Sequence, residues 1–193
     1  MYDQRYLKRL QKAGRISRFL KQKIIYPKLS KYTYGECLDY GCGDLTFLKY
    51  LKLNHQKLKL VGFDVNSHIY PLAKDLGIEF HSKTNSLSNK FNFIICDNVL
   101  EHIPNWKSCL SDVVSRMEEN STLIIGLPGF QGYSHDITHE TFITGFDIQM
   151  FAEKFELKYI RRIWYPLNLE FFANIAQLYS RHILCYHVLI KRS

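Results

Sequence analysis

The sequence predicts an α/β protein whose mostly parallel, seven-stranded sheet carries helices on both faces. Two observations support this prediction. From Glu36 onward, short apolar runs alternate with longer segments of helical periodicity, a pattern typical of parallel strands joined by helices. Several of these runs are apolar throughout, as expected when helices cover both faces of a sheet. Because the 193 residues show no internal repeat or linker, we expect one domain with one core.

The first predicted element is a basic helix over residues 4–25. Apolar side chains recur at helical spacing along one side of it, and lysines and arginines lie on the other. Pro27 should end it, because proline lacks the backbone amide and crowds the preceding turn. The first 31 residues hold ten Lys or Arg against the single acid Asp3. We expect residues 1–33 to form a helical cover on a core made by residues 36–193.

The strands and helices of the core are predicted from the same periodicities. The first five strands are expected at 37–40, 58–64, 78–81, 91–96 and 122–127, with helices at 45–53, 67–76 and 105–117. After Pro128 we expect a polar loop at 129–141, a helix at 146–155, a strand at 157–164, a helix at 167–180 and a final strand at 182–191.

The composition excludes several classes of protein. A hydrophobic fraction of 46% is ordinary for a globular protein and argues against disorder. No apolar run approaches the roughly 18 residues of a membrane span, and the N-terminus lacks the apolar stretch of a secretion signal, so a cytoplasmic location is expected. The five cysteines form no C-x-x-C pair, and we interpret them as reduced packing residues.

The most informative segment is 38–45, where Gly41 and Gly43 stand just beyond an apolar strand and just before a helix. Without a Cβ atom, backbone amides there can approach a ligand closely. The next strand ends at Asp64, about 20 residues after the glycines, as nucleotide-binding sheets require. A carboxylate at that position can accept hydrogen bonds from both hydroxyls of a ribose. The two features together predict a nucleotide-type ligand.

With the apolar strand at 91–95 and the segment Val99-Leu100-Glu101-His102-Ile103 that follows, this pattern resembles the class I S-adenosylmethionine-dependent methyltransferases. More narrowly, it is similar to the small-molecule branch called type 11 or type 12. The similarity spans about residues 36–165. The resemblance implies a Rossmann-like sheet of seven strands with the last strand antiparallel, and a cofactor lying across the carboxyl ends of the first and second strands.

The resemblance also implies the role of each residue toward S-adenosylmethionine. The methionine part would lie beside the glycine segment, the ribose on Asp64 and the adenine against Val65. Leu45 stands where the family has a third glycine, and the family's adenine-binding acid is missing from 81–85, which leaves Asn85 or a main-chain amide for that contact. The predicted cofactor-binding residues are Asp39, Gly41, Cys42, Gly43, Asp64, Val65, Asn85, Asp97 and Asn98.

The loop at 133–142 follows the fifth strand, where such sheets carry substrate contacts. It resembles the Asp-x-Thr-His stretch of methyltransferases from glycan-assembly clusters. An oxygen or nitrogen nucleophile gains from a nearby base, and imidazole titrates close to working pH, so His139 is the first catalytic candidate and His135 the second. The loop lacks the helical H-E-x-x-H order, so no metal is predicted. We interpret Glu101 and His102 as the start of a helix.

The acceptor is left open between a small molecule, including a sugar or a lipid-linked glycan, and nucleic acid. The nucleic-acid alternative is not favoured, because Asp97 and Asn98 are followed by Val-Leu and not by two prolines and an aromatic residue. A non-catalytic cofactor-binding protein is a further alternative. The basic N-terminal helix could also rest on anionic lipid as a peripheral membrane contact. The sequence does not fix the oligomeric state.

Overall fold

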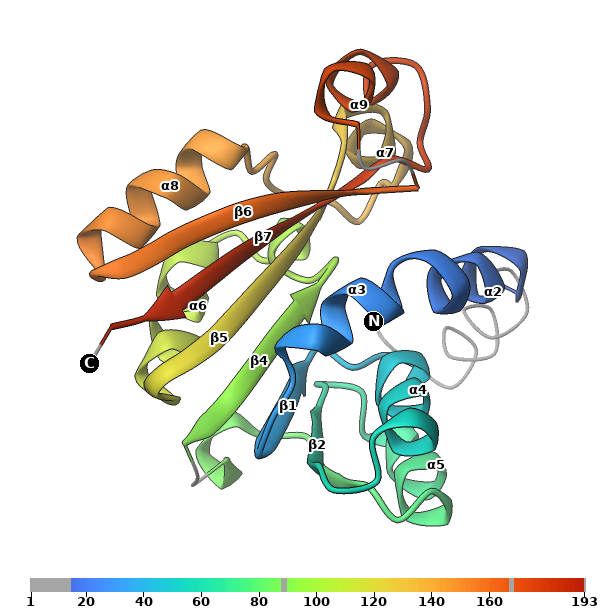
Figure 1. Cartoon of the computed structure of the whole chain (residues 1–193). Helices are drawn as coiled ribbons and strands as arrows, with labels where there is room; N and C mark the ends of the chain where they lie inside the picture. Colours follow the sequence, from blue (N-terminus) through green and yellow to red (C-terminus); the bar gives the residue numbers. More distant parts are fainter. Residues whose placement is uncertain (1–14, 88–89, 167–168, 193) are drawn as a thin grey trace.

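A single sheet runs through the structure, a computed structural model that describes residues 15–87, 90–166 and 169–192 (Figure 1). Its strands are β1 (Glu36–Tyr40), β2 (Lys59–Phe63), β3 (Glu79–His81), β4 (Phe91–Asp97), β5 (Met117–Pro128), β6 (Leu157–Tyr165) and β7 (Leu184–Lys191). Their order across the sheet is β3-β2-β1-β4-β5-β7-β6. The pairs among β1 to β5 are parallel, and β7 is antiparallel to both β5 and β6. The predicted seven-stranded sheet with an antiparallel last strand is confirmed.

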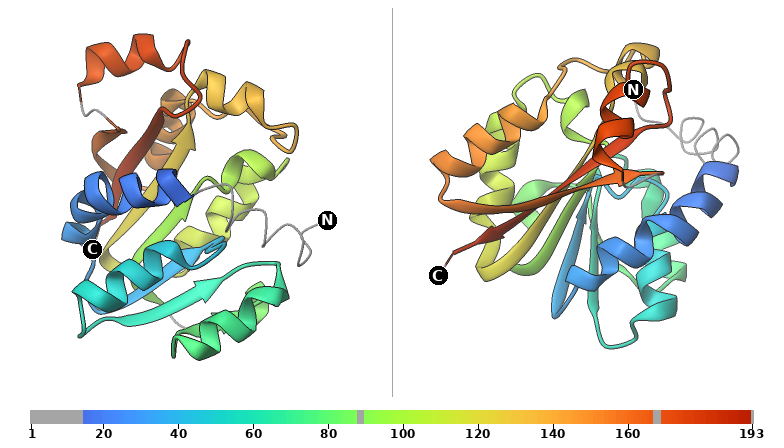
Figure 2. Two further views of the ribbon diagram at one scale, coloured as in Figure 1. Left: turned by 90° about the vertical axis from the view of Figure 1, so that its right-hand side faces the viewer. Right: turned by 45° about the horizontal axis from the view of Figure 1, so that its top comes forward.

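Helices cover both faces of this sheet, as Figure 2 shows. One face packs against α3 (Tyr26–Leu29), α4 (Thr46–Asn54) and α5 (Tyr70–Asp75), and the other against α6 (Trp106–Ser115) and α8 (Gly145–Lys154). Successive side chains of β4 alternate between the two resulting cores: Phe93 and Ile95 enter the first, and Ile94 and Cys96 the second. Four of the five cysteines are buried, as expected for packing residues.

The helix predicted at 67–76 is divided. A 3-10 turn, η2 (Ser67–Ile69), precedes α5, which carries Pro71 in its first turn. The physical reason is that Pro71 has no amide to donate back to Ser67, so one continuous helix cannot form there. A helix therefore restarts at Tyr70.

The prediction of a polar loop over 129–141 is wrong in part, because the segment contains α7 (Phe130–His135). Although the segment is mostly polar, the ring of Phe130 packs edge-on against Phe142, with centroids 5.8 Å apart. The following insert, predicted as a helix at 167–180, is α9 (Glu170–Ala176), and residues 167–168 lie outside the described part of the chain.

The N-terminal helix is described from Arg15 as α2 (Arg15–Ile24), and residues 4–14 of the prediction lie outside the described residues. It ends at Ile24, and Pro27 stands in the first turn of the short helix α3 that follows. Tyr26 and Leu29 of α3 are buried in the core, which anchors α2 at the carboxyl edge of the sheet (Figure 1). Within the described ranges, no helix is long and apolar enough to cross a bilayer.

Candidate active site

A cavity of about 800 Å³ opens at the carboxyl ends of β1, β2 and β4. β1 and β4 are the neighbours between which the order of the strands reverses, and such points are where open α/β sheets bind ligands. The lining comes from the segments that follow these strands, from α2, and from the end of α7 with the residues after it. The cavity has the size of a site for a small molecule.

The bend after β1 uses its two glycines differently. Gly41 has φ +80°, and a Cβ atom on it would lie 2.4 Å from Cγ2 of Val99, so the packing of Val99 requires a glycine there. Gly43 has φ +51°, and a Cβ on it would meet nothing within 4 Å. Cys42, between them, is buried and donates its amide to the carbonyl of Phe63 at 2.9 Å. Of these two glycines, therefore, only Gly43 adjoins open space in which a ligand can lie.

Asp64 is tied to this bend directly. Its Oδ2 accepts the amide hydrogen of Gly43 at 2.9 Å, and its Oδ1 accepts that of Asn66 at 2.8 Å. Burial raises the pKa of Asp64, and the two amides act in the opposite direction. Each carboxylate oxygen keeps a further lone pair, so the group can still accept ribose hydroxyls. Val65, which is 66% exposed, lines the cavity next to it.

Two more of the predicted residues stand at strand ends inside the cavity. Asp39 is the next-to-last residue of β1 and is 4% exposed, and burial, followed by the charges of Asp97 and Asp64, raises its pKa well above the ordinary value. Asp97 closes β4 and accepts hydrogen bonds from Lys21 Nζ at 2.9 Å and from the side-chain amide of Asn98 at 3.2 Å. Two carboxyl groups therefore meet at the base of the cavity.

Two basic side chains of α2 reach this acidic region. Lys21 forms the ion pair with Asp97, and Arg18 pairs with Asp44 in the glycine bend. The sequence predicted a basic cover but did not place Arg18 or Lys21 in the site. The sequence signal for this contact was a helix with one basic side, followed by strands whose carboxyl ends carry aspartates.

Asn85 is not brought to the cavity. It is exposed on the 3-10 turn η3 (Thr84–Ser86), and its neighbour Thr84 lines the cavity instead. The predicted contact of Asn85 with adenine therefore has no support in this geometry. The other eight predicted cofactor-binding residues line the cavity: Asp39, Gly41, Cys42, Gly43, Asp64, Val65, Asp97 and Asn98.

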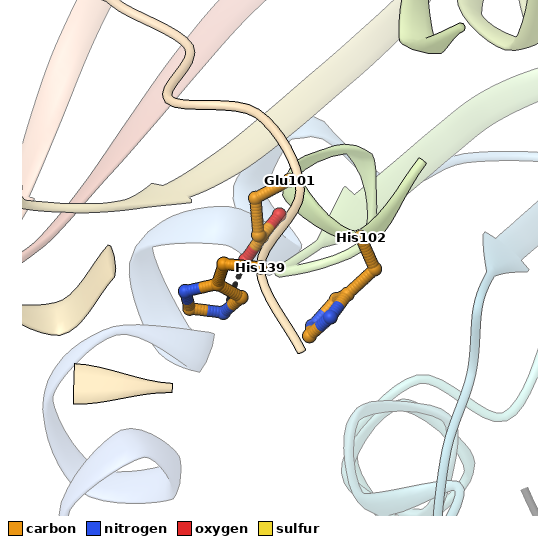
Figure 3. Close-up of side chains that lie close together, drawn as sticks. All are labelled: Glu101, His102 and His139. Atoms are coloured by element: carbon orange, nitrogen blue, oxygen red, sulfur yellow. Dashed lines mark ion pairs between the residues drawn. The ribbon is translucent and has the colours of Figure 1, made fainter. Parts of the chain in front are cut away.

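A cluster of one carboxylate and two imidazoles lies in the same cavity (Figure 3). Glu101 and His102 belong to the 3-10 turn η4 (Leu100–His102) after β4, and His139 comes from the segment after α7. Glu101 Oε1 lies 3.9 Å from Nε2 of His139, and the two imidazole rings have centroids 4.7 Å apart. The sequence interpretation of Glu101 and His102 as a helix start missed this: their turn is a single 3-10 turn whose side chains face the cavity.

The backbone of the turn fixes His139 beside it. The carbonyl oxygen of Glu101 accepts the amide hydrogens of Glu140 at 2.7 Å and of Thr141 at 3.1 Å. The ring of Tyr133 stacks on His139 with centroids 5.4 Å apart. Burial raises the pKa of Glu101 to about 8, and the nearby charge of Asp97 adds to the effect. Burial lowers the pKa of His102.

His135, the second catalytic candidate, also lines the cavity but stands apart from this cluster. It lies at the end of α7, is exposed, and accepts a hydrogen bond at Nε2 from Arg181 at 2.6 Å. The structure therefore brings His139, and not His135, next to a buried carboxylate.

Several solved methyltransferases share this fold. The plantazolicin methyltransferase BpumL, in complex with a monoazolic desmethylPZN analog and SAH, is 15% identical, with 98% of this chain and 90% of that chain covered and a TM-score of 0.68. An S-adenosylmethionine-dependent methyltransferase from Archaeoglobus fulgidus is 15% identical, with 98% and 100% covered and a TM-score of 0.72. The N-methyltransferase NodS from Bradyrhizobium japonicum WM9 is 12% identical, with 95% and 99% covered and a TM-score of 0.66.

Sequence comparison with curated proteins finds no match. A family model described as a methyltransferase domain matches residues 4–184, which is most of the chain. The match covers the glycine bend, the carboxyl edge of the sheet and the Glu101–His139 cluster. The chain belongs to this methyltransferase domain family and is an S-adenosylmethionine-dependent methyltransferase.

Proposed function

We propose that this enzyme methylates an oxygen or nitrogen atom of a small molecule that binds between the cofactor and His139. The observation that carries the proposal is that one cavity joins the Gly43–Asp64 pair to the Glu101–His139 pair. The plantazolicin methyltransferase and the N-methyltransferase NodS, which share the fold, support an acceptor of this size. A sugar or a lipid-linked glycan is the acceptor class that the 133–142 segment favours.

The residues around the glycine bend fit the cofactor. Asp64 would hold the ribose, Val65 the adenine, and the open space at Gly43 the methionine part. The cofactor supplies an electrophilic methyl group on a positively charged sulfur. Asp97, although it is paired with Lys21, would favour that charge, and the cavity would align the acceptor with the methyl group, which supplies much of the rate.

His139 is suited to take the acceptor's proton. Its Nδ1 lies 2.8 Å from the carbonyl oxygen of Tyr133, which can only accept, so Nδ1 carries the hydrogen and Nε2 carries the lone pair. Glu101 Oε1 lies 3.9 Å from this nitrogen and would stabilise the imidazolium once the acid is ionised, which its raised pKa of about 8 shifts toward mildly alkaline pH. His135 is less suited, because the lone pair of its Nε2 already accepts from Arg181.

The cofactor site is tested by calorimetric titration with S-adenosylmethionine. Asp64→Ala removes the ribose contact together with the acceptor for two backbone amides, so we expect the Kd to rise by about tenfold or more. Asp75→Ala, an exposed aspartate on α5, is the matched control and should bind as the parent does. Equal affinity of Asp64→Ala and the parent would remove the basis of the assignment of the ribose site.

The transfer itself is tested with a radiolabelled methyl donor and a fractionated cell extract, which identifies the acceptor as lipid, sugar, protein or nucleic acid. For the acceptor found, His139→Gln should lower kcat by about 100-fold or more with little change in cofactor affinity, because a positioned base contributes about that much. His135→Gln should have a smaller effect. The proposal for His139 fails if the two variants lose equal activity.

The remaining sequence alternatives gain less support. The basic N-terminal helix could bind nucleic acid or anionic lipid. However, its Arg18 and Lys21 side chains pair with carboxylates of the cavity, which leaves fewer basic groups for such a partner. Salt-dependent binding to RNA, or sedimentation with anionic liposomes, would revive them. We also propose a cytoplasmic location for the enzyme.

A further inference from the structure

The Glu101, His102 and His139 side chains have the composition of a metal site. Their ligand atoms, one from each residue, all lie within 4.8 Å of one another. Figure 3 shows the carboxylate of Glu101 directed at the His139 ring, and the His102 ring lies beside this pair. We propose that these three residues bind a divalent first-row transition-metal ion at the acceptor end of the cavity.

Both imidazoles are held in the orientation that ligands need. Nδ1 of His102 lies 3.1 Å from the carbonyl oxygen of Thr138, and Nδ1 of His139 lies 2.8 Å from that of Tyr133. A carbonyl can only accept, so each Nδ1 carries the hydrogen and each Nε2 presents a lone pair. Metal-binding histidines usually have this second hydrogen bond, which fixes the tautomer and the ring.

Glu101 supplies the independent observation. Its side chain is 1% exposed, and neither carboxylate oxygen has a hydrogen-bond partner among the described residues. A carboxylate buried without partners is unfavourable in its ionised form, and a bound cation offsets that penalty. Oδ1 of Asn98, in the same cavity, is likewise buried without a partner. The two residues that carry these three unsatisfied oxygens line the cavity that holds the two imidazoles.

The donor set indicates which ions fit. Two imidazole nitrogens and one carboxylate suit Zn²⁺, Fe²⁺ and their neighbours, whereas Mg²⁺ and Ca²⁺ prefer oxygen ligands throughout. Bonds of about 2.1 Å place neighbouring ligand atoms about 3 to 3.5 Å apart, so the three groups must move together by about 1 Å when the ion binds. Three protein ligands leave further coordination positions open to an acceptor or water.

The role of the ion rests on the proposed function. An acceptor hydroxyl that coordinates the ion has a lowered pKa, loses its proton to solvent, and attacks the methyl group as an alkoxide while the carbon–sulfur bond breaks. In the metal-loaded enzyme, Nε2 of His139 is then a ligand, and the ion replaces it as the group that activates the acceptor. The inference therefore narrows the acceptor to a hydroxyl compound.

The site is tested by metal binding without turnover. The full chain is treated with a chelator, freed of it, and titrated with Co²⁺, whose visible absorption reports a site of four or five ligands. We expect one Co²⁺ per chain, displaced by Zn²⁺, and a Tm raised by Zn²⁺ because the ion binds only the folded chain. Glu101→Gln and His102→Gln should each weaken Co²⁺ binding by about tenfold or more.

His182→Gln is the matched control, because His182 lines the same cavity outside the cluster. It should bind Co²⁺ as the parent does. Glu101→Gln keeps the size of a buried side chain, and His102, only partly buried, provides a second variant if the first does not fold. The inference is overturned if the parent binds no Co²⁺, if it binds only Mg²⁺, or if His182→Gln loses as much affinity as the ligand variants.

Methyl transfer, measured with and without Zn²⁺, separates this inference from the proposed function. Transfer to an extract component by a chain that binds no metal would refute the site and leave His139 as the base. Metal binding at the cluster without transfer to any fraction would keep the site and refute the proposed function.

Discussion

Leu45 holds a backbone conformation that leucine seldom adopts, with φ 61° and ψ 21° directly before α4. It is fully buried, and Gly62 on β2 leaves the room for it: a Cβ on Gly62 would lie 3.3 Å from Cδ2 of Leu45. The left-handed conformation costs about 1 to 2 kcal/mol, whereas a buried leucine contributes about 2 to 5 kcal/mol over alanine. Packing therefore explains why leucine replaces the third glycine of the family.

From these magnitudes we expect Leu45→Gly to lower the free energy of unfolding by about 2 kcal/mol, although it restores the family's glycine. Denaturation with urea measures this. Glu156→Gly is the opposite case, because Glu156 has φ 55° just after α8 and is exposed, so only strain is relieved. It should stabilise by up to about 1 kcal/mol. Stabilisation by Leu45→Gly would show that strain outweighs packing.

At the scale of elements, α2 places two basic side chains, Arg18 and Lys21, in the cavity where we propose that the cofactor binds. Lys21 lies against Asp97 with both side chains largely buried, so its charge is poorly screened. S-adenosylmethionine carries a positive sulfur that its demethylated product lacks. Lys21 therefore opposes binding of the substrate form more than binding of the product form.

Replacing Lys21 with methionine should increase the preference for S-adenosylmethionine over S-adenosylhomocysteine by about 10- to 20-fold. For unit charges about 10 Å apart, an effective dielectric constant of about 20 gives about 1.7 kcal/mol. The ratio of the two Kd values, from calorimetry, measures the change and cancels contacts common to both ligands. Lys23→Met removes a charge from the exposed side of the same helix and should leave the ratio unchanged. A shift of the same size in both variants would contradict the assignment to Lys21.

The elements also show which parts of the site were predictable. That Gly43 and Asp64 lie together was predictable, because each follows its own strand and parallel neighbouring strands end at one edge. The contact of Glu101 with His139 was not predictable. It depends on how the segment after α7 packs against η4, where the backbone carbonyl of Glu101 accepts two hydrogen bonds from that segment. No periodicity in either segment encodes that contact.

At the scale of the molecule, the number of strands and the antiparallel last strand were predictable, since apolar runs mark strands and the family pattern gives their order. The N-terminal helix was predictable as a basic cover but not as a partner of the cavity acids, because periodicity identifies the side of a helix and not what it faces. α7 was missed because its segment is mostly polar and shows no helical repeat of apolar residues.

β7 joins the parallel and antiparallel parts of the sheet and carries a buried histidine, His187, near its middle. His187 is 2% exposed, and its Nδ1 lies 2.6 Å from the hydroxyl of Tyr159 on β6. A Cβ on Gly145 would lie 3.0 Å from its ring, so the glycine leaves the space for the imidazole. Burial, together with the charge of Arg162, lowers the pKa of His187 to about 4.

The folded protein should therefore lose stability in acid through His187. Its pKa is lower folded than the unfolded value of about 6.5, so the unfolded chain binds more protons, and the contribution is complete above about pH 6.5 and is lost as the pH falls toward about 4. Between about pH 7.5 and about pH 5 this amounts to about 2 kcal/mol. Urea denaturation at both pH values should show that loss reduced in His187→Gln, which cannot titrate. An equal loss in the parent and in His187→Gln would assign the acid sensitivity to other groups.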